Sequence, residues 1–416
     1  MPGKTRVVVG GVDTHKYIHV AAVLDPNGAL LGSASFTTGE RGYEQLLSWM
    51  RSIGDVAKVG VEGTGSYGAG LTRHLQSHGV RVVEVNRPDR QARRSRGKSD
   101  TVDAEAAARA ALAGLAKVVP KTRDGIVESI RAIRIAFCSA RESCTRVANQ
   151  IRDLIVTAPE ELRAALSPLA TAERAARCAH FDIAGDAAEA LAGTRLALRA
   201  LGRRYLALTT EMDELERVLD SLTAEANPAL RGMKGVGTDV AAILLVAAGD
   251  NPQRMTSESA FAAFCGVSPI EASSGKIVRH RLNRGGNRQA NHALWRIVMV
   301  RLTCDQATRR YSARRQAEGK SDREAMRCLK RYVARDVYRH LVAPGQVPAG
   351  PDLRVARVAA GLTLAVVARR FGTSMIKISR LERALDHDTE FARRYERYLL
   401  EAQSGANSTE DPAHAA

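Results

Sequence analysis

The chain is 416 residues long, with a formal net charge of +17 at neutral pH and apolar residues at 45% of its positions. This length accommodates two to four domains, and the apolar content excludes a chain that is disordered throughout. No stretch approaches the roughly 20 consecutive apolar residues of a membrane span, and the first residues, MPGKTRVVVGGVD, lack the pattern of a signal peptide. The excess of positive charge instead predicts a polyanionic partner.

The number and spacing of the cysteines indicate the cellular compartment of the protein. The sequence contains six cysteines, and none of them forms a Cys-x-x-Cys pair. This spacing argues against a zinc ribbon and against a disulfide framework. We therefore expect reduced thiols and a cytoplasmic location.

The first 115 residues alternate between apolar and helical segments in a definite order. Strands are predicted at 7–13, 19–25, 29–38, 58–64 and 80–86, and helices at 39–53, 67–78 and 101–115. The turn Pro26-Asn27-Gly28 makes the second and third strands a hairpin. Three strands followed by alternating helices and strands is the order of an α/β RNase H-like domain, a mixed sheet with helices on its faces.

Four acidic residues occupy the ends of these elements. Asp13 ends the first strand, Glu62 lies at the end of the fourth, and Asp100 and Asp103 begin the last helix. Strands one and four are neighbours in this plan, so the four carboxylates are expected at one edge of the sheet. Such a cluster repels itself unless cations bind, and its hard oxygen ligands suit Mg²⁺ or Mn²⁺. Two such ions can serve phosphodiester chemistry by activating a nucleophile and stabilising the leaving oxygen.

Each acid taken alone has a structural explanation. Asp13 could simply end a strand, and Asp100 and Asp103 could favour the positive end of their helix. Glu62 is harder to explain in this way, because it follows an apolar strand and opens the glycine-rich EGTGSYG, where backbone can approach a ligand closely. The occurrence of all four at matching points of one topology favours the metal site.

Two basic segments are candidate nucleic-acid contacts. RPDRQARRSRGK (87–98) precedes the acidic helix, and after Glu271 the segment up to residue 304 holds seven Lys or Arg and no acid. A run of charge can be a solvated face, but phosphate contact is favoured in a chain this basic. The residues proposed for these contacts are Arg87, Arg90, Arg93, Arg94, Arg96, Lys98, Lys276, Arg279, Arg281, Arg284 and Arg288.

Most of the remaining sequence is predicted to be helical. Residues 126–225 contain little Gly or Pro, and 196–226 has heptad-like Leu spacing, which fits a packed bundle and an intermolecular coiled coil equally well. Residues 230–250 are similar to a helix-hairpin-helix element, whose Gly235-Val236-Gly237 turn could expose N–H groups to an anion or simply join two helices.

Three motifs give a family resemblance. GVDTHK (11–16), VEGTGSYG (61–68) and KSDTVDAEAAARA (98–110) together resemble the DEDD-type transposases of insertion sequences, whose catalytic domain looks like the RuvC Holliday-junction resolvase. The resemblance covers most of residues 7–342. It implies that Asp13, Glu62, Asp100 and Asp103 are catalytic, metal-binding acids. It also implies transposition by recombination, guided in characterised relatives by an element-encoded bridge RNA.

The same family places a serine nucleophile after a Gly-[Leu/Val]-[Ser/Thr]-Pro motif. Here the motif is Gly266-Val267-Ser268-Pro269, followed by Ser273-Ser274-Gly275. Ser274 matches best and Ser273 is the second choice. From the residues alone, a loop serine in a local turn would be the simpler interpretation.

The C-terminal tail is predicted to be a separate module joined by a linker at 344–352. Its helices around Gly361 and Gly372 resemble the helix-turn-helix of phage-repressor-type regulators, with Ser374, Lys377, Ser379 and Arg380 facing DNA. A small helical packing module is the alternative.

These inferences together predict a transposase or DNA recombinase that cuts and rejoins DNA with a metal-bound DEDD cluster and a serine. Expected partners are donor and target DNA, a guide RNA and further copies of the chain in a dimer or tetramer, without a membrane, at a bacterial-type nucleoid. The alternatives are a metal-dependent, structure-specific nuclease that uses water, and a DNA-binding regulator. The predicted domains are 1–125 (RuvC-like), 126–226 (helical or coiled coil), 227–343 (transposase domain with the serine), 352–400 (helix-turn-helix-like) and 401–416 (disordered).

Overall fold

The computed structural model describes residues 6–85, 99–183, 186, 189–275, 280–345 and 347–407. The chain divides into two compact units, one of Met1–Gly125 with Ala248–Thr256, the other of Ile126–Ala247 with Ser257–Ala416. All six cysteines are free thiols. In the ranges given above, no helix combines the length and the apolar character needed to cross a membrane.

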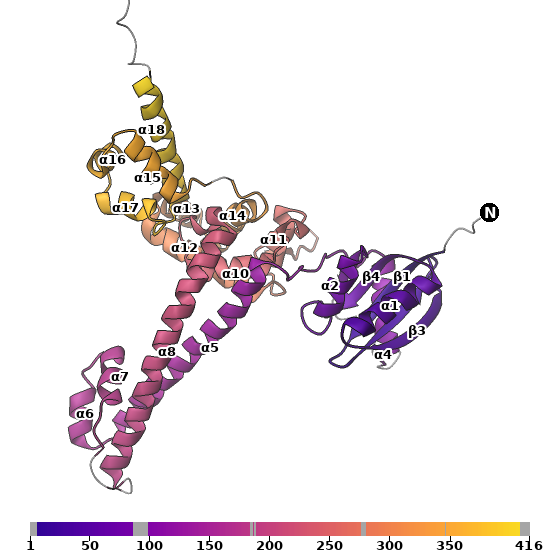
Figure 1. Cartoon of the computed structure of the whole chain (residues 1–416), viewed down its shortest axis with the longest axis horizontal. Helices are drawn as coiled ribbons and strands as arrows, with labels where there is room; N and C mark the ends of the chain where they lie inside the picture. The colour runs from indigo at the N-terminus through magenta and orange to yellow at the C-terminus, as the bar shows by residue number, and fades with distance from the viewer. Residues whose placement is uncertain are drawn as a thin grey trace, which may run out of the picture. The chain divides into compact units, whose positions relative to one another are not determined.

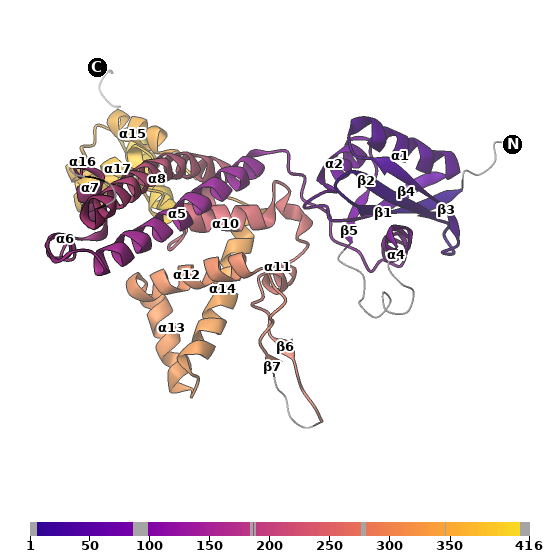
Figure 2. The same cartoon turned by 90° about the horizontal axis from the view of Figure 1, so that it is seen from below.

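The first unit is built on a five-stranded sheet, in the order β3-β2-β1-β4-β5. Its elements are β1 (Val7–Thr14), β2 (Ile18–Leu24), β3 (Leu30–Thr37), α1 (Glu40–Ile53), β4 (Asp55–Glu62), α2 (Ala69–Ser77), β5 (Val82–Val85) and α4 (Asp100–Leu112). Strand β1 pairs antiparallel with β2 and parallel with β4. Figure 2 shows α1 and α2 on one face of the sheet and α4 on the other. This arrangement confirms the mixed RNase H-like sheet and the neighbouring first and fourth strands.

Alternation along β1 separates the two faces. Val8 and Val12 belong to the core under α1 and α2, together with Leu46 and Met50 of α1. Val9 instead packs with Ala111 of α4. Since successive side chains of a strand point to opposite faces, Asp13 lies on the α4 face.

Two glycines allow α4 to lie directly on the sheet. A Cβ atom on Gly11 would collide with the backbone of Ala104 and Ala108, and one on Gly60 would lie 2.6 Å from the carbonyl oxygen of Ala107. Ala104, Ala107, Ala108 and Ala111 of α4 complete this close approach, because they are buried and carry only a methyl group each. The contact fixes the first turn of α4 beside the ends of β1 and β4.

The second unit contains a long helical pair. Helices α5 (Ile126–Val156) and α8 (Ala190–Ala226) pack along each other, and the shorter α6 (Glu160–Leu166) and α7 (Thr171–Ala179) join them; Figure 1 shows α6 and α7 at one end of the pair. Their shared core includes Ile151, Leu166, Cys178 and Leu198. The Leu spacing of α8 thus has a partner within the chain, as the bundle interpretation requires.

Further helices of this unit surround a short hairpin. They are α9 (Pro228–Arg231), α10 (Thr238–Ala248), α11 (Glu258–Phe264), α12 (Arg288–Cys304), α13 (Gln306–Ala317) and α14 (Asp322–Val342), with strands β6 (Ile270–Glu271) and β7 (His280–Arg281). Figure 2 shows the β6–β7 hairpin extending away from α11. The predicted helix-hairpin-helix has a first helix of one turn, and Gly235 at φ 89° makes its turn.

Four helices form the tail: α15 (Gly350–Ala359), α16 (Leu364–Phe371), α17 (Met375–Glu382) and α18 (Thr389–Asn407). Gly372 ends α16 in the left-handed conformation, as the predicted turn of a helix-turn-helix requires. Helix α18 continues beyond residue 400, where the sequence predicted the ordered tail to end. Burial of Leu399 and a hydrogen bond from Gln403 Nε2 to the carbonyl oxygen of Ala356 account for the extension.

Candidate active site

An acidic group with one imidazole lies where β1 ends beside α4. The Nε2 atom of His15 is 3.1 Å from Asp13 Oδ2 and 3.4 Å from Asp100 Oδ1. Each of the three residues offers a ligand atom, and these atoms lie within 4.8 Å of one another. Asp13 is buried, whereas Asp100 and His15 are accessible. A small cation could therefore reach the group from solvent.

Asp103 and Glu62 lie on the same side of the sheet. Asp103 is buried in the first turn of α4, and Glu62 ends β4 next to Val61, which faces the opposite core. The Thr14 hydroxyl donates to the carbonyl oxygen of Glu62 at 2.8 Å and ties the ends of β1 and β4 together. Among the described residues, the three-residue group above includes neither carboxylate, so the structure unites two of the four predicted acids and places the others on the same face.

The electrostatics of Asp13 favour a bound cation. Burial raises the pKa of Asp13; His15 opposes this shift, while the negative charges of Asp103 and Asp100 add to it. Asp100 and Asp103 also occupy the first turn of α4, where the helix dipole favours negative charge. A divalent cation would relieve the remaining repulsion, and these carboxylate oxygens are the donors that Mg²⁺ and Mn²⁺ prefer.

His15 is the residue of this group that the sequence prediction missed. It stands in the GVDTHK motif, two positions after Asp13, and the sequence prediction names only the aspartate of that motif as a ligand. The period of a strand would put residues 13 and 15 on one face, so the spacing was a usable signal. What the spacing could not show is the approach of Asp100 to the same ring.

The candidate serines belong to the second unit, whereas the carboxylates belong to the first. Ser273 and Ser274 follow β6 and are exposed, and Gly275 adopts a left-handed φ of 57°. The serine prediction therefore falls on an accessible loop.

The predicted basic contacts are described only in part. Arg281 lies on β7, and Arg284 and Arg288 border a cavity at the base of the hairpin. The remaining ones lie outside the described residues: Arg87, Arg90, Arg93, Arg94, Arg96, Lys98, Lys276 and Arg279.

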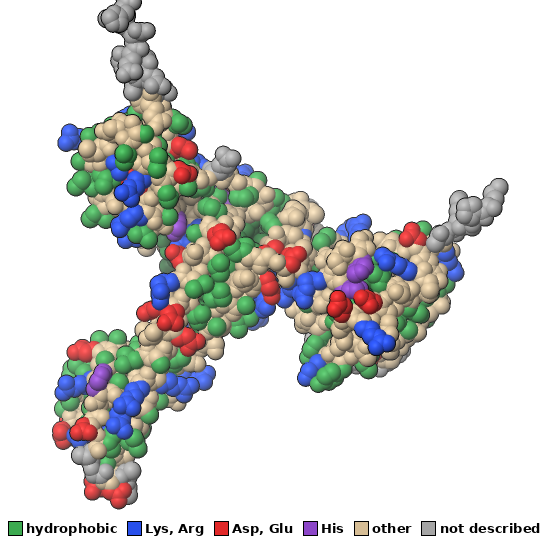
Figure 3. Space-filling view, viewed as in Figure 1, with side chains coloured by type: hydrophobic (Ala, Val, Ile, Leu, Met, Phe, Trp, Pro, Cys, Tyr) green, Lys and Arg blue, Asp and Glu red, His purple; other side chains and the backbone are tan. Residues whose placement is uncertain are grey.

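The tail positions predicted to face DNA differ in their surroundings. Ser374 caps α17, and Lys377 pairs with Asp388 at 2.7 Å and lies over the ring of Phe391. Ser379 is half-buried, while Arg380 is exposed. Figure 3 shows basic and hydrophobic side chains mixed over α15 and α17.

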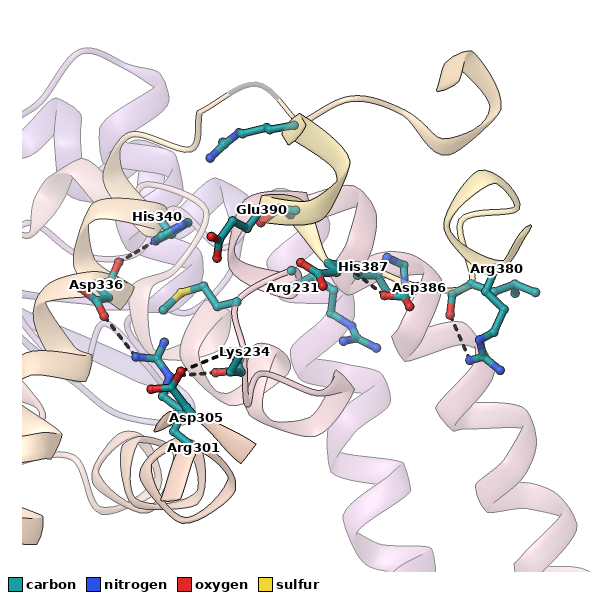
Figure 4. Close-up of a pocket in the computed structure, with 16 residues that line it drawn as sticks. Arg231, Lys234, Arg301, Asp305, Asp336, His340, Arg380, Asp386, His387 and Glu390 are labelled. Carbon is teal, nitrogen blue, oxygen red and sulfur yellow. Dashed lines mark hydrogen bonds and ion pairs between the residues drawn. The ribbon is translucent and has the colours of Figure 1, made fainter. Parts of the chain in front are cut away.

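Arg380 lines a cavity of about 760 Å³ between the tail and α9, α12 and α14. Charges of both signs surround this cavity. Figure 4 shows Arg301 directed to Asp336 and Lys234 beside Asp305. Because these carboxylates pair with the basic side chains, the cavity is a weaker candidate for binding a polyanion than a cavity lined by basic residues alone.

Two segments of the chain match known families. Residues 10–158 match a transposase family of the IS110 type with a DEDD domain. The first unit is thus similar to the DEDD domain of IS110-type transposases. Residues 227–313 match the transposase IS116/IS110/IS902 family. The first match includes Asp13, Glu62, Asp100 and Asp103, and the second includes Ser274.

Curated proteins similar to this chain come from insertion elements. An uncharacterized 43.6 kDa protein of insertion element IS110 from Streptomyces coelicolor is 36% identical over 106 residues, which are 25% of this chain and 26% of the relative. An uncharacterized 42 kDa protein of insertion element IS900 from Mycobacterium paratuberculosis is 27% identical over 165 residues, 39% of this chain and 40% of the relative. The match thus spans about a quarter of the first relative and about two fifths of the second. A mini-circle protein named as a transposase for IS117 from S. coelicolor is 24% identical over 319 residues, 64% of this chain and 77% of the relative.

Proposed function

We propose that the protein is the transposase of an insertion sequence, which cuts and rejoins DNA at a carboxylate-bound metal with a serine as nucleophile. The observation that carries the proposal is the group of Asp13, His15 and Asp100, formed within the segment that matches a DEDD transposase domain. Donor and target DNA are the substrates, and the net charge of +17 favours such polyanions.

In this proposal, Asp13 and Asp100 hold the metal, and Glu62 and Asp103 complete the acidic face. Mg²⁺, or Mn²⁺, when bound would activate the attacking oxygen and stabilise the leaving oxygen. His15 orients both aspartates, since its Nε2 lies within 3.1 and 3.4 Å of their carboxylates. Buried Asp13 and Asp103 keep this face of the site fixed while Asp100 remains open to the phosphate.

The serine step exchanges one phosphodiester bond for another. The Oγ atom of Ser274 attacks the phosphorus and loses its proton to solvent, and the bond from phosphorus to the departing DNA oxygen breaks. That oxygen takes up a proton and leaves as a hydroxyl, so one DNA end remains as a phosphoserine ester. Attack by another DNA hydroxyl reverses the step and joins new ends without ATP.

Charge-only substitutions test the metal assignment. Asp13→Asn, Glu62→Gln, Asp100→Asn and Asp103→Asn are each expected to abolish recombination of a donor plasmid while the protein stays folded. Asp55→Asn, an exposed acid at the start of β4, is the matched control and should retain activity. Full activity in any two of the four variants would refute the assignment.

A nicked or suicide DNA substrate tests the serine. We expect a DNA-linked peptide containing Ser274 in mass spectra, and loss of both cleavage and joining in Ser274→Ala with DNA binding intact. Ser273→Ala is the matched control, and a crosslink at Ser273 would move the nucleophile by one residue. Cleavage by Ser274→Ala without a covalent species would instead indicate a nuclease that uses water.

We also propose a guide RNA and a homo-oligomer as partners. The family resemblance supports the RNA, and the basic charge is compatible with it. Recombination with and without the structured RNA of the flanking element tests the first proposal, and sedimentation of the DNA complex tests the second. Equal activity without the RNA would leave the protein to find DNA by its own contacts.

The tail is proposed to bind duplex DNA through α17. The turn between α16 and α17 at Gly372 supports this role, as does the exposure of Arg380 and Arg383. In the full chain, replacing both arginines by Ala should weaken duplex binding in a salt-dependent way. Lys377→Ala is unsuitable as a test, because Lys377 pairs with Asp388 within the tail and its loss would also disturb the packing. Unchanged duplex affinity in the double variant would favour the packing module.

A further inference from the structure

A cavity of about 530 Å³ lies between α12, α14 and the base of the β6–β7 hairpin. Five cationic side chains line it: Arg284, Arg288, Arg323, Arg327 and Lys330. No carboxylate is among its lining residues. Concentrated like charge in a concave site raises the local potential and attracts anions.

Helical spacing produces this surface. On α12, Arg288, His292 and Trp295 stand three or four residues apart, and they therefore share one face. On α14, Arg323, Arg327 and Lys330 share a face in the same way. The two helices pack against each other, so the two basic faces line one groove.

The cations of the groove differ from their neighbours on the same helix. Arg331 and Arg335 of α14 both pair with Glu258 of α11, at 3.1 and 2.9 Å. By contrast, none of the five groove cations forms an ion pair with a carboxylate in the part of the chain that the structure describes. Their charge remains available to an external anion.

Lys330 is held in place by a chain of hydrogen bonds. Its Nζ atom donates to Asn291 Oδ1 at 2.9 Å, and Asn291 Nδ2 donates to the carbonyl oxygen of Cys265 at 2.8 Å. Burial lowers the pKa of Lys330. The ammonium group is thus positioned at the floor of the groove before any ligand arrives.

An aromatic surface accompanies these charges. Trp295 is 40% exposed, and its ring stacks on His292 with centroids 5.4 Å apart and planes 26° apart. Both residues line the groove. A large exposed ring beside fixed cations matches the combination by which proteins bind single strands, with bases on aromatic rings and phosphates on basic side chains.

We propose that this groove binds unpaired nucleotides of a DNA strand, with a base stacked on Trp295 and the backbone phosphates on the five cations. The choice of DNA rather than RNA as the strand rests on the proposed function, whereas the binding of a single strand rests on the groove itself. A second cavity of about 550 Å³ adjoins the groove at Arg288 and His292, but its other arginines already pair with Asp239. The proposed strand therefore lies on the five cations of the groove itself.

Tryptophan fluorescence gives a direct test, since the chain has two tryptophans and the other is Trp49 of α1. In a Trp49→Phe background, oligo(dT) should quench the emission of Trp295, and duplex DNA of equal length should quench it much less. A titration with oligo(U) tests whether the strand is DNA or RNA. If oligo(U) quenches Trp295 as strongly as oligo(dT) or more strongly, the groove binds RNA.

Affinity measurements by anisotropy separate stacking from charge. Trp295→Ala should weaken oligo(dT) binding about 5- to 100-fold, and Trp295→Phe should weaken it less. Arg327→Ala should lower the slope of log affinity against log salt by about 0.7. Arg310→Ala on α13, an exposed arginine outside the groove, is the control and should change neither the quenching nor the Trp295-dependent affinity.

Binding is measured in EDTA, so the result does not depend on metal at the carboxylate group. If the protein does not cleave DNA but binds oligo(dT), the groove proposal still holds. If it cleaves DNA but does not bind oligo(dT) in the groove, the catalytic proposal still holds. Two results would overturn the groove assignment. One is that oligo(dT) does not quench the emission of Trp295, and the other is that Trp295→Ala and Trp295→Phe both bind oligo(dT) as tightly as the unmodified protein. Dissociation of an oligomer in Trp295→Ala with unchanged oligo(dT) affinity would show a protein interface instead.

Discussion

The Nε2 atom of His15 lies 3.1 Å from Oδ2 of Asp13. The same nitrogen is 3.4 Å from Asp100, so one ring connects the end of β1 with the first turn of α4. A ring in this position either coordinates a cation directly or holds two ligating carboxylates in place, and both roles make metal binding depend on it.

We therefore predict that His15→Ala weakens Mn²⁺ binding about 10- to 100-fold. Calorimetric titration of the purified protein with Mn²⁺ measures the change. His15→Gln, which keeps a polar group, should lose less. His78→Ala on the surface of the same unit, at the end of α2, is the control. An unchanged Mn²⁺ affinity in His15→Ala would remove His15 from the site.

Removing charge from the acidic face should stabilise the protein without metal. Asp13 is buried next to Asp103 and Asp100. Without a cation, Asp13→Asn should raise the Tm by about 4 °C, the shift that roughly 1 kcal/mol gives in a small domain. Scanning calorimetry with EDTA measures this. Added Mn²⁺ should raise the Tm of the unmodified protein and leave that of the variant unchanged. A lower Tm of the variant in EDTA would show that Asp13 is needed for the fold.

The close contact of α4 with the sheet depends on Gly11. We expect Gly11→Ala to destabilise the first unit by about 1–3 kcal/mol, because its Cβ meets backbone atoms that cannot move aside. Metal binding should weaken with it, since α4 carries Asp100. Gly32→Ala on β3 is the matched control, as its Cβ would lie 3.4 Å from Trp49, an ordinary contact. Chemical unfolding of both variants distinguishes them, and equal stability would argue against the glycine contact.

The second unit offers a pH-dependent ion pair. Hydrogen bonds from Thr308, followed by the pairing with Lys234, lower the pKa of Asp305 to about 2. Because this pKa lies below the ordinary value of 3.8 for an aspartate, the stabilising contribution is present above about pH 4 and is lost as the pH falls toward 2. At pH 7, Asp305→Asn should cost about 1 kcal/mol, because solvent screens the pair and Asn can still accept hydrogen bonds from Thr308.

Urea unfolding of both proteins between pH 7 and pH 3 measures this difference. The difference between Asp305→Asn and the unmodified chain should be constant from pH 7 to about pH 5 and narrow below pH 4. Asn retains the capacity to cap α13, so the variant isolates the charge. A difference that grows toward low pH would have the wrong sign and contradict the prediction.

The tail is held together by a buried ion pair. Arg357 Nε donates to Glu382 Oε1 at 2.7 Å, and the hydroxyl of Tyr395 donates to the same oxygen at 2.8 Å. Glu382→Gln should destabilise the tail by about 3 kcal/mol, because Arg357 stays buried without a counter-charge. Hydrogen exchange of α15–α18 measures the loss. The double variant Arg357→Met/Glu382→Leu should recover much of it, and equal loss in both would contradict the explanation.

The sequence by itself determined the order of the elements in the first unit. Strand and helix periods are local properties of the sequence. The apolar pattern therefore predicts which residues share a buried face, such as Val8 and Val12 of β1. The acids at the element ends could be located for the same reason. The sequence also marked the two helices around Gly372, because a left-handed helix end favours glycine locally.

Only the tertiary structure decided which side chains meet. His15 stands near Asp13 in the sequence, but its approach to Asp100 depends on α4 lying on Gly11 and Gly60. Lys377 was predicted to face DNA, yet the packing of α18 brings Asp388 to it. The basic groove arises from α12 and α14, whose residues look like ordinary exposed arginines in sequence. Local periods fix which face of a helix is polar, whereas the packing of distant segments fixes what that face meets.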